Sequence, residues 1–279
     1  MPVSEIVPLW FMTPAVFIFG TIIGSFLNVL ILRSNTGRSL SGRSGCFSCG
    51  AQLAWWQLVP VLSYIFLRGR CTSCGSRISL QYPIGEMLTG LLFVVVWFTA
   101  PTVWLVLFGF ALVAALVYVT MYDIRHTIIP DKAVVVVGLL AISYWLLAGN
   151  DISLHTLLAH LAGSLVATVP LFTLWFGSRG RAMGFGDVTL GAVLGFFGGW
   201  SSALVLLWCA FVSGGLVGAG LLLWAHIRPI LNRSSLSSAH TPYTMKSEVP
   251  FGPFVVFGFM VSFFFGAQFT DLVALFTFL

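Results

Sequence analysis

Residues 103–121 read VWLVLFGFALVAALVYVTM, a stretch of apolar and small side chains that contains no charged residue. A helix needs about 20 predominantly apolar residues to cross the hydrocarbon core of a bilayer, and this stretch approaches that length. Asp123 follows two positions later, where the apolar stretch ends. The sequence therefore predicts a membrane-spanning helix here, with a carboxylate at one edge of the membrane.

The composition extends this pattern to the whole chain. Of the 279 residues, 58% are hydrophobic and only 8% are charged, whereas a typical soluble domain carries about 25% charged residues. So few charges cannot solvate the surface of a soluble protein, which excludes soluble, disordered and nucleic-acid-binding classes. We therefore predict an all-α polytopic membrane protein.

The apolar stretches divide the chain into membrane-spanning helices and one long loop. The predicted spans are 8–32, 84–100, 103–121, 133–148, 155–176, 188–200, 202–226 and 251–275. The sixth is interrupted by glycines at 195, 198 and 199. We expect residues 1–32 to hold a retained first span, residues 33–82 to form a cytoplasmic loop, and residues 83–279 to form the membrane core.

The basic residues predict the orientation of this arrangement. With eight spans, loops 33–82, 122–132, 177–187 and 227–250 fall on one side of the membrane. All 13 basic residues lie on that side: Arg33, Arg38, Arg43, Arg68, Arg70, Arg77, Arg125, Lys132, Arg179, Arg181, Arg228, Arg233 and Lys246. Because cytoplasmic loops are enriched in Lys and Arg, this side is predicted to be cytoplasmic and both termini to lie outside.

Four cysteines in the long loop have the spacing of a metal site. Cys46 and Cys49, and then Cys71 and Cys74, form two C-x-x-C-G units in which the following glycine permits a tight turn. Two such units can complete a tetrahedral Zn-S4 site, and four filled positions favour a structural zinc over a catalytic one. Disulfides are disfavoured on the reducing cytoplasmic side. Cys209, alone in an apolar span, is expected to contribute packing only.

Asp123 and Asp187 are the acids most suited to chemistry. The first ends an inward-running span and the second begins an outward-running one, so both are expected at the cytoplasmic edge of the membrane. Two carboxylates brought close cannot both ionise, and such a pair can act as acid and base toward an amide. Gly184 and Gly186 would allow a close backbone approach, either for helix packing or for an extended substrate.

A simpler interpretation remains open for acids at the ends of spans. An acid there is often a solvated helix cap, which is the preferred interpretation for Asp131 after Pro130. Glu86 lies about a turn into the second span, where capping competes with a buried functional role. His126 neighbours Asp123 and could tune it.

Taken together, the motifs resemble those of bacterial type IV prepilin leader peptidases, membrane aspartic proteases of the GxGD class. The resemblance rests on segments in family order along most of the chain. These are Gly24-Ser-Phe-Leu-Asn28, both cysteine units, Leu58–Tyr64 with Leu67–Cys71, Tyr82-Pro83 with Glu86–Gly90, Asp123 with Ile129-Pro130-Asp131, Gly184-Phe-Gly-Asp187, and Pro250-Phe-Gly-Pro253-Phe.

The resemblance implies a function and its residues. It implies that Asp123 and Asp187 are the catalytic pair of an endopeptidase in the bacterial inner membrane. Members cleave the basic leader of type IV pilins and type II secretion pseudopilins after Gly at the cytoplasmic face. They then usually methylate the new N-terminal residue with S-adenosylmethionine, and the cysteine loop is associated with such bifunctional members.

Three positions depart from the family pattern, and two rival functions remain. Thr189 stands where Lys is common, Gln57 where an acid often follows the two Trp, and Gln81 where Arg often precedes Tyr82. The loop changes bear on methyl transfer more than on proteolysis. One rival is a transporter or proton channel with the aspartates as a relay. The other makes the loop a methyltransferase or partner-docking module without proteolysis.

Overall fold

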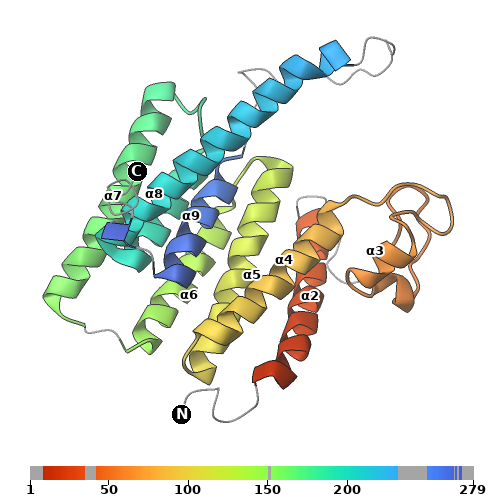
Figure 1. The fold of residues 1–279 in the computed structure, drawn as a ribbon, viewed down its shortest axis with the longest axis horizontal. Helices are drawn as coiled ribbons and strands as arrows, with labels where there is room; N and C mark the ends of the chain where they lie inside the picture. Colours follow the sequence, from red (N-terminus) through yellow and green to blue (C-terminus); the bar gives the residue numbers. More distant parts are fainter. Residues whose placement is uncertain are drawn as a thin grey trace. The chain divides into compact units, whose positions relative to one another are not determined.

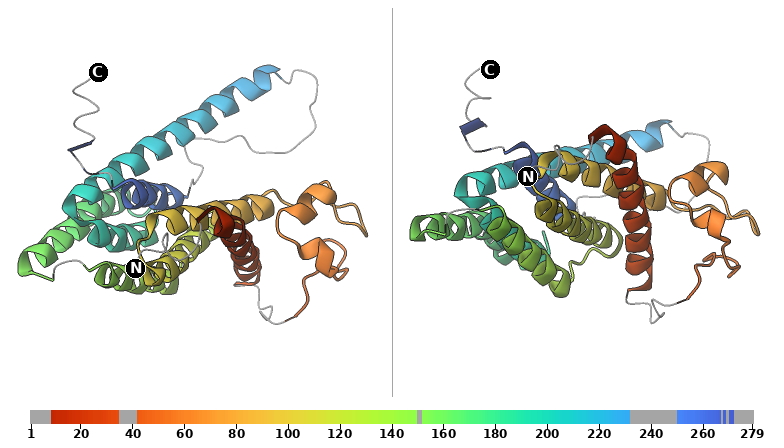
Figure 2. Two further views of the ribbon diagram at one scale, coloured as in Figure 1. Left: turned by 60° about the horizontal axis from the view of Figure 1, so that its bottom comes forward. Right: turned by 90° about the horizontal axis from the view of Figure 1, so that it is seen from below.

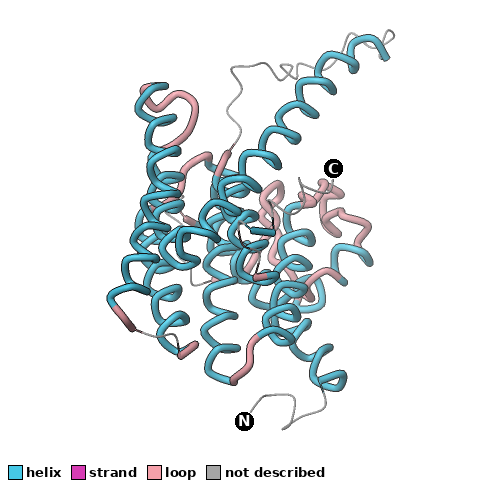
Figure 3. The backbone as a smooth tube through the Cα atoms, turned by 60° about the vertical axis from the view of Figure 1, so that its left-hand side comes forward, coloured by secondary structure: helices cyan, strands magenta, loops and turns pink. Residues whose placement is uncertain are grey.

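The computed structural model describes residues 9–34, 42–149, 152–231, 250–266, 268, 270 and 271. Most of the predicted polar loop 227–250 lies outside this range, as do Arg38, Arg233 and Lys246. Figure 3 shows helices and loops but no strand in the described part of the chain, where pairing is limited to two isolated bridges, Gly45 with Gln52 and Arg70 with Arg77. The all-α prediction is confirmed.

The helices follow the predicted apolar stretches closely. They are α2 (Leu9–Arg33), η1 (Trp55–Leu58), α3 (Leu62–Phe66), α4 (Gln81–Thr99), α5 (Val103–His126), α6 (Asp131–Leu147), α7 (Leu154–Ser178), α8 (Phe185–Leu231) and α9 (Gly252–Phe265). Within the described residues, five helices are long and apolar enough to cross a membrane, namely α2, α4, α5, α7 and α8. The chain is therefore a multi-pass membrane protein, and the count of eight spans stays a prediction.

Glycines account for two features of the helix boundaries. Gly199 has φ +73° and ψ 178°, so the continuous run α8 contains a kink where the sixth and seventh spans were predicted to meet. The predicted helix 251–275 is interrupted, because α9 ends at Phe265 and Gly266 adopts a left-handed φ of +59°. Left-handed glycine is a common helix terminator, which explains this correction.

The chain forms two compact units, which we describe separately. The first comprises Met1–Met121 with Ser143–Gly149, and in it α2 packs along α4 (Figure 1). Phe93 of α4 is buried and stacks on Phe110 of α5 with ring centroids 4.3 Å apart. The segment between α2 and α4, which carries η1 and α3, lies beside these helices in both views of Figure 2.

The second unit comprises Tyr122–Ile142 with Asn150–Leu279, and in it α8 packs against α7 and α9. Small residues permit the closest approach: a Cβ atom on Gly195 of α8 would lie 2.6 Å from the carbonyl oxygen of Gly163 in α7. Membrane helices commonly pack through such small residues, because apolar side chains alone gain little over lipid contacts. This unit contains both aspartates singled out from the sequence.

Candidate active site and metal centre

Asp123 lies one turn before the end of α5 and is only 4% exposed. Its Oδ2 atom accepts a hydrogen bond of 3.0 Å from the backbone N–H of Gly252, the first residue of α9. The N-terminal end of a helix carries a partial positive charge, so α9 presents a favourable environment to this carboxylate. Asp123 is thus oriented by a residue 129 positions away in sequence.

Asp187 lies in the first turn of α8 and is 5% exposed. Its Oδ2 atom accepts a hydrogen bond of 3.1 Å from the backbone N–H of Gly184. Its Oδ1 atom is also buried and has no hydrogen-bond partner among the described residues. Because buried polar atoms normally find a partner, Oδ1 is the atom of this side chain that is available to a water molecule or a substrate.

Ile129, in the connection between α5 and α6, links the surroundings of the two aspartates. A Cβ atom on Gly186 would lie 2.8 Å from Ile129 Cβ, and one on Gly252 would lie 2.9 Å from Ile129 Cδ1. The two carboxylates are close enough to interact electrostatically. The structure therefore brings Asp123 and Asp187 together, and it uses Gly186 for close packing, one of the two roles foreseen for that glycine.

Two buried carboxylates that lie close together can act as an acid–base pair. When one is ionised and the other holds a proton, the first can deprotonate water and the second can protonate a leaving amine. Neither residue is a solvated cap, since both are almost completely buried. Asp131, by contrast, is exposed in the first turn of α6, in keeping with the capping role predicted for it.

The structure places two other predicted residues away from this chemistry. His126 packs its ring on Tyr122, with centroids 4.4 Å apart, and among the described residues no hydrogen bond joins it to Asp123. Thr189 donates its hydroxyl hydrogen bond to the carbonyl of Gly186, 3.0 Å away on its own helix. The threonine therefore caps local backbone at the position where the family commonly carries Lys.

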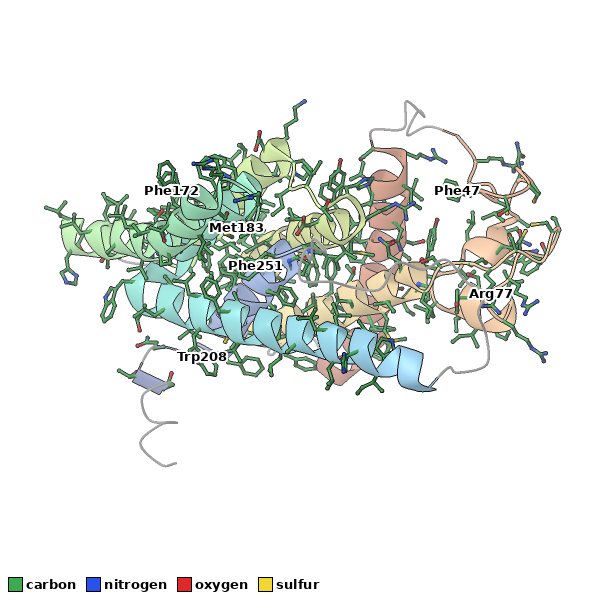
Figure 4. All side chains as sticks on the ribbon, turned by 90° about the horizontal axis from the view of Figure 1, so that it is seen from above. Phe47, Arg77, Phe172, Met183, Trp208 and Phe251 are labelled. Atoms are coloured by element: carbon green, nitrogen blue, oxygen red, sulfur yellow. The ribbon has the colours of Figure 1, made fainter. Side chains whose placement is uncertain are left out.

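Sequence reasoning missed the role of Gly252. It lies in the segment Pro250–Phe254, which was noted only as part of a resemblance. The preceding Phe251 packs against Phe211 of α8, with ring centroids 5.4 Å apart, and is labelled beside α9 in Figure 4. This aromatic contact holds the start of α9 against α8. A Pro-flanked glycine after a polar loop was the available signal, but nothing local in it identifies the partner Asp123.

The four predicted metal ligands gather at one point in the loop between α2 and α4. The Sγ atoms of Cys46, Cys49, Cys71 and Cys74 all lie within 4.8 Å of one another, and those of Cys46 and Cys74 are 3.9 Å apart. Tetrahedral Zn–S bonds of about 2.3 Å place sulfurs about 3.8 Å apart, so the cluster fits one such ion. No disulfide joins the described cysteines.

Both halves of this cluster have the same backbone construction. Gly50 N–H donates to the Cys46 carbonyl, and Gly75 N–H donates to the Cys71 carbonyl, each at 2.9 Å. The two glycines have φ of +72° and +69°, as the tight turn in a C-x-x-C-G unit requires. Hydrogen bonds, the largest contribution coming from the backbone N–H of Cys49, lower the pKa of the Cys46 thiol to about 6.

Comparison with known families accounts for both sites. A family model described as the bacterial peptidase A24 N-terminal domain matches residues 18–100, and one described as the type IV leader peptidase family matches residues 110–219. The chain belongs to the type IV leader peptidase family. The cysteine cluster lies inside the first match and both aspartates lie inside the second, so the resemblance seen in the motifs is confirmed.

Individual members of the type IV leader peptidase family match over most of the chain. The protein from Pseudomonas putida is 32% identical over 89% of this chain and 88% of its own length. The protein from Neisseria gonorrhoeae is 33% identical over 75% and 82%, respectively. The protein from Myxococcus xanthus is 36% identical over 74% of this chain but only 62% of its own length. All three are named prepilin leader peptidase/N-methyltransferase. No solved structure matches this chain.

Glu86 of this leader peptidase family member attaches the cysteine loop to the helices. It is buried in α4, where its Oε2 atom accepts a hydrogen bond of 2.7 Å from the backbone N–H of Val61. Val61 has φ +62°, a left-handed conformation that is unusual for a β-branched residue. The hydrogen bond to Glu86 therefore stabilises a strained turn. Of the two roles considered for Glu86, helix capping and a buried role, the structure favours the buried one.

Replacing Glu86 by Ala should loosen this turn. The half-buried Val61 N–H would lose its acceptor, at a cost of about 0.5–1.5 kcal/mol. We expect hydrogen exchange of the Val61 amide to accelerate by about 10-fold or more, measured by mass spectrometry in detergent. Glu86→Gln keeps an acceptor oxygen and should show a smaller effect. Equal exchange in the Ala variant and the parent would contradict this attachment.

Proposed function

We propose that this chain is a membrane aspartic endopeptidase that removes the leader of type IV prepilins and pseudopilins, followed by N-methylation of the new N-terminal residue. The observation that carries the proposal is the buried pair Asp123 and Asp187, in a chain that belongs to the type IV leader peptidase family. The names of its relatives, prepilin leader peptidase/N-methyltransferase, support both activities. A proton-relay transporter is not favoured by these relatives.

The two aspartates divide the hydrolysis between them. The ionised carboxylate removes a proton from water, whose oxygen forms a bond with the carbonyl carbon of the last leader residue. The protonated carboxyl group donates its proton to the nitrogen as the C–N bond breaks, which frees the new amine. Asp187, with its unpartnered Oδ1 atom, is suited to contact the water, while Asp123 is fixed through Oδ2 by Gly252.

The orientation of the chain in the membrane determines on which side the aspartates meet the substrate. We propose that the cysteine loop and both aspartates face the cytoplasm of a bacterial inner membrane and that both termini face the periplasm. The basic residues on the predicted cytoplasmic side support this orientation. A prepilin would then present its basic leader on the side where it is synthesised, with its apolar helix between the spans.

Methyl transfer uses S-adenosylmethionine as a second substrate. The match of residues 18–100 to the bacterial N-terminal domain, and the names of the relatives, support this step. Gln57, one of the departures from the family pattern, donates to the Thr72 hydroxyl at 2.7 Å and so joins the two halves of the cysteine loop. The departure therefore has a structural role of its own within the loop.

Cleavage and methylation can be separated by product mass. The purified protein in detergent is incubated with a candidate prepilin, with and without S-adenosylmethionine. We expect loss of the leader in both reactions, and one additional methyl group on the mature pilin only when the methyl donor is present. An uncut prepilin, with ion flux in vesicles instead, would overturn the proposal in favour of the transporter. Cleavage without methylation would restrict it to the peptidase.

We propose that the cysteine cluster binds one structural zinc ion, and this makes a direct prediction. Cys71→Ser, which removes a buried ligand, should reduce bound zinc from about one ion per chain to nearly none, measured by elemental analysis after gel filtration. Cys209→Ser is the matched control, since Cys209 is equally buried but lies alone in α8. Zinc content unchanged by Cys71→Ser would contradict the assignment.

A further inference from the structure

A row of exposed apolar side chains lies outside the membrane-spanning helices, on the loop that carries the cysteine cluster. In α3, Leu62, Ile65 and Phe66 are all exposed, and Phe66 is 77% exposed. Their spacing of three and four residues puts them on one face of the helix. Soluble surfaces rarely expose apolar side chains in such a contiguous group, so this face calls for a covering partner.

The neighbouring helix η1 extends the same surface. It packs against α3 and exposes Trp55, Trp56 and Leu58, with Trp55 80% exposed. We refer to these six side chains as the apolar ridge: Trp55, Trp56, Leu58, Leu62, Ile65 and Phe66. Tryptophan is enriched where proteins meet the membrane–water interface, because its ring has an apolar body and a polar N–H group.

The hydrogen bond between Val61 and Glu86 fixes the depth of this ridge. Glu86 is five residues into α4, which begins at Gln81, so it lies about 7.5 Å along the axis of a helix that is long and apolar enough to cross a membrane. Val61 donates to it and immediately precedes α3. The ridge therefore begins at the level of the second turn of a spanning helix. Interfacial helices bury their apolar face about 5–10 Å into the headgroup and acyl boundary, which is a comparable depth.

The positive charge of the same segment favours binding to a negatively charged surface. Residues 42–80 contain four arginines, all exposed, and no acid. Those arginines are Arg43, Arg68, Arg70 and Arg77. Arg68 and Arg70 follow directly on α3, and Figure 4 shows Arg77 and Phe47 on the same loop. Lys and Arg side chains near an anionic leaflet are attracted to its headgroups.

We propose that the apolar ridge inserts into the cytoplasmic leaflet of the membrane and that the neighbouring arginines bind anionic lipid headgroups there. The cysteine loop is then a membrane-embedded module rather than a free cytoplasmic one. A second copy of this loop is a poor occupant, because two acid-free, arginine-rich surfaces repel each other. A basic leader peptide is disfavoured for the same reason. The inference rests on the membrane topology and does not depend on the peptidase reaction.

Photo-cross-linking in nanodiscs tests this arrangement on the full chain. The protein is placed in nanodiscs of phosphatidylcholine alone or mixed with phosphatidylglycerol, each containing a lipid with a diazirine on its acyl chain. After irradiation, cross-linked peptides are mapped by mass spectrometry, with α2 and α4 as internal positive controls. We expect cross-links on residues 55–66 in the mixed nanodiscs and several-fold fewer with phosphatidylcholine alone.

Variants separate the ridge from the rest of the loop. The triple variant Leu62→Ser, Ile65→Ser, Phe66→Ser should lose most cross-links on residues 55–66 while keeping its zinc content, which shows that the loop remains folded. Phe47→Ser is the matched control, since Phe47 is exposed to 63% but lies in the first cysteine unit instead of on the ridge. It should cross-link like the parent. Arg68→Gln with Arg70→Gln should lower cross-linking toward the phosphatidylcholine level.

Three results would overturn the inference. The first is a ridge without cross-links in nanodiscs where α2 and α4 are labelled. The second is equal cross-linking in neutral and anionic nanodiscs, which would remove the role of the arginines. The third is ridge peptides cross-linked to a second copy or to an added prepilin instead of to lipid. Leader cleavage measured on the same samples reports on the proposed function separately, and its loss or retention decides none of these outcomes.

Discussion

Asp123→Asn and Asp187→Asn are each expected to reduce the rate of leader cleavage by about 10²–10⁴-fold, the range contributed by a positioned general acid or base. An asparagine keeps the size of the side chain but can neither accept the proton of water nor donate one to the leaving nitrogen. Because the two groups act as a pair, each single variant should lose nearly as much activity as the double variant. The rate is measured by following prepilin and mature pilin by mass spectrometry under single-turnover conditions.

Asp131→Asn is the matched control for these variants. It makes the same chemical change in the same compact unit, but Asp131 is exposed in the first turn of α6. We expect it to cleave at close to the parental rate. Parental cleavage by either Asp123→Asn or Asp187→Asn would contradict the assigned pair. So would a loss of activity in Asp131→Asn as large as in the other two.

Gly252→Ala should reduce cleavage by about 100-fold although it leaves both aspartates in place. An added Cβ atom would lie 2.7 Å from Asp123 Oδ2 and 2.9 Å from Ile129 Cδ1, so the carboxylate or the start of α9 must move. A misplacement of about 1 Å in a catalytic geometry can cost about 10²-fold in rate. The backbone N–H that orients Asp123 moves with it. The effect should appear mainly in kcat, because the substitution displaces a catalytic carboxylate.

Gly220→Ala supplies the control for the glycine substitution. Gly220 lies in α8 and has no atom within 4 Å of an added Cβ atom, so this variant changes the same group without crowding. It should retain parental cleavage and thermal stability. If Gly252→Ala cleaves normally, the contact between α9 and Asp123 does not orient the carboxylate. If Gly252→Ala loses activity but unfolds at a temperature close to that of Gly220→Ala, the defect is confined to the active site.

Local signals in the sequence were sufficient to predict the helices and the cluster of four cysteines. Apolar stretches such as 103–121 predict helices because a backbone in lipid must satisfy its own hydrogen bonds. The C-x-x-C-G units are equally local, since two residues between cysteines and a left-handed glycine define the turn. The end of α9 at Phe265 was not foreseen, because the apolar sequence continues past Gly266 and only the backbone conformation of that glycine ends the helix.

The surroundings of the aspartates depend on contacts that no local pattern carries. The pairing of Asp123 with Asp187 was inferred from their equal depth at the ends of two spans and from the family resemblance. The residues that donate hydrogen bonds to the buried carboxylates lie at very different distances from them in the sequence. Gly184 lies three residues from its acceptor and within the same motif. Gly252 and Val61, by contrast, find their carboxylate partners 129 and 25 residues away, through close packing of helices and loops.

The late position of Gly252 in the chain has a consequence for biosynthesis. Both aspartates have been synthesised by residue 187, but the backbone N–H that orients Asp123 belongs to α9, which leaves the ribosome after residue 252. A nascent chain therefore carries its complete chemistry for some 65 residues of translation before that chemistry can be aligned. Asp123 therefore gains this orienting hydrogen bond only after α9 has been synthesised and packed against the helices before it.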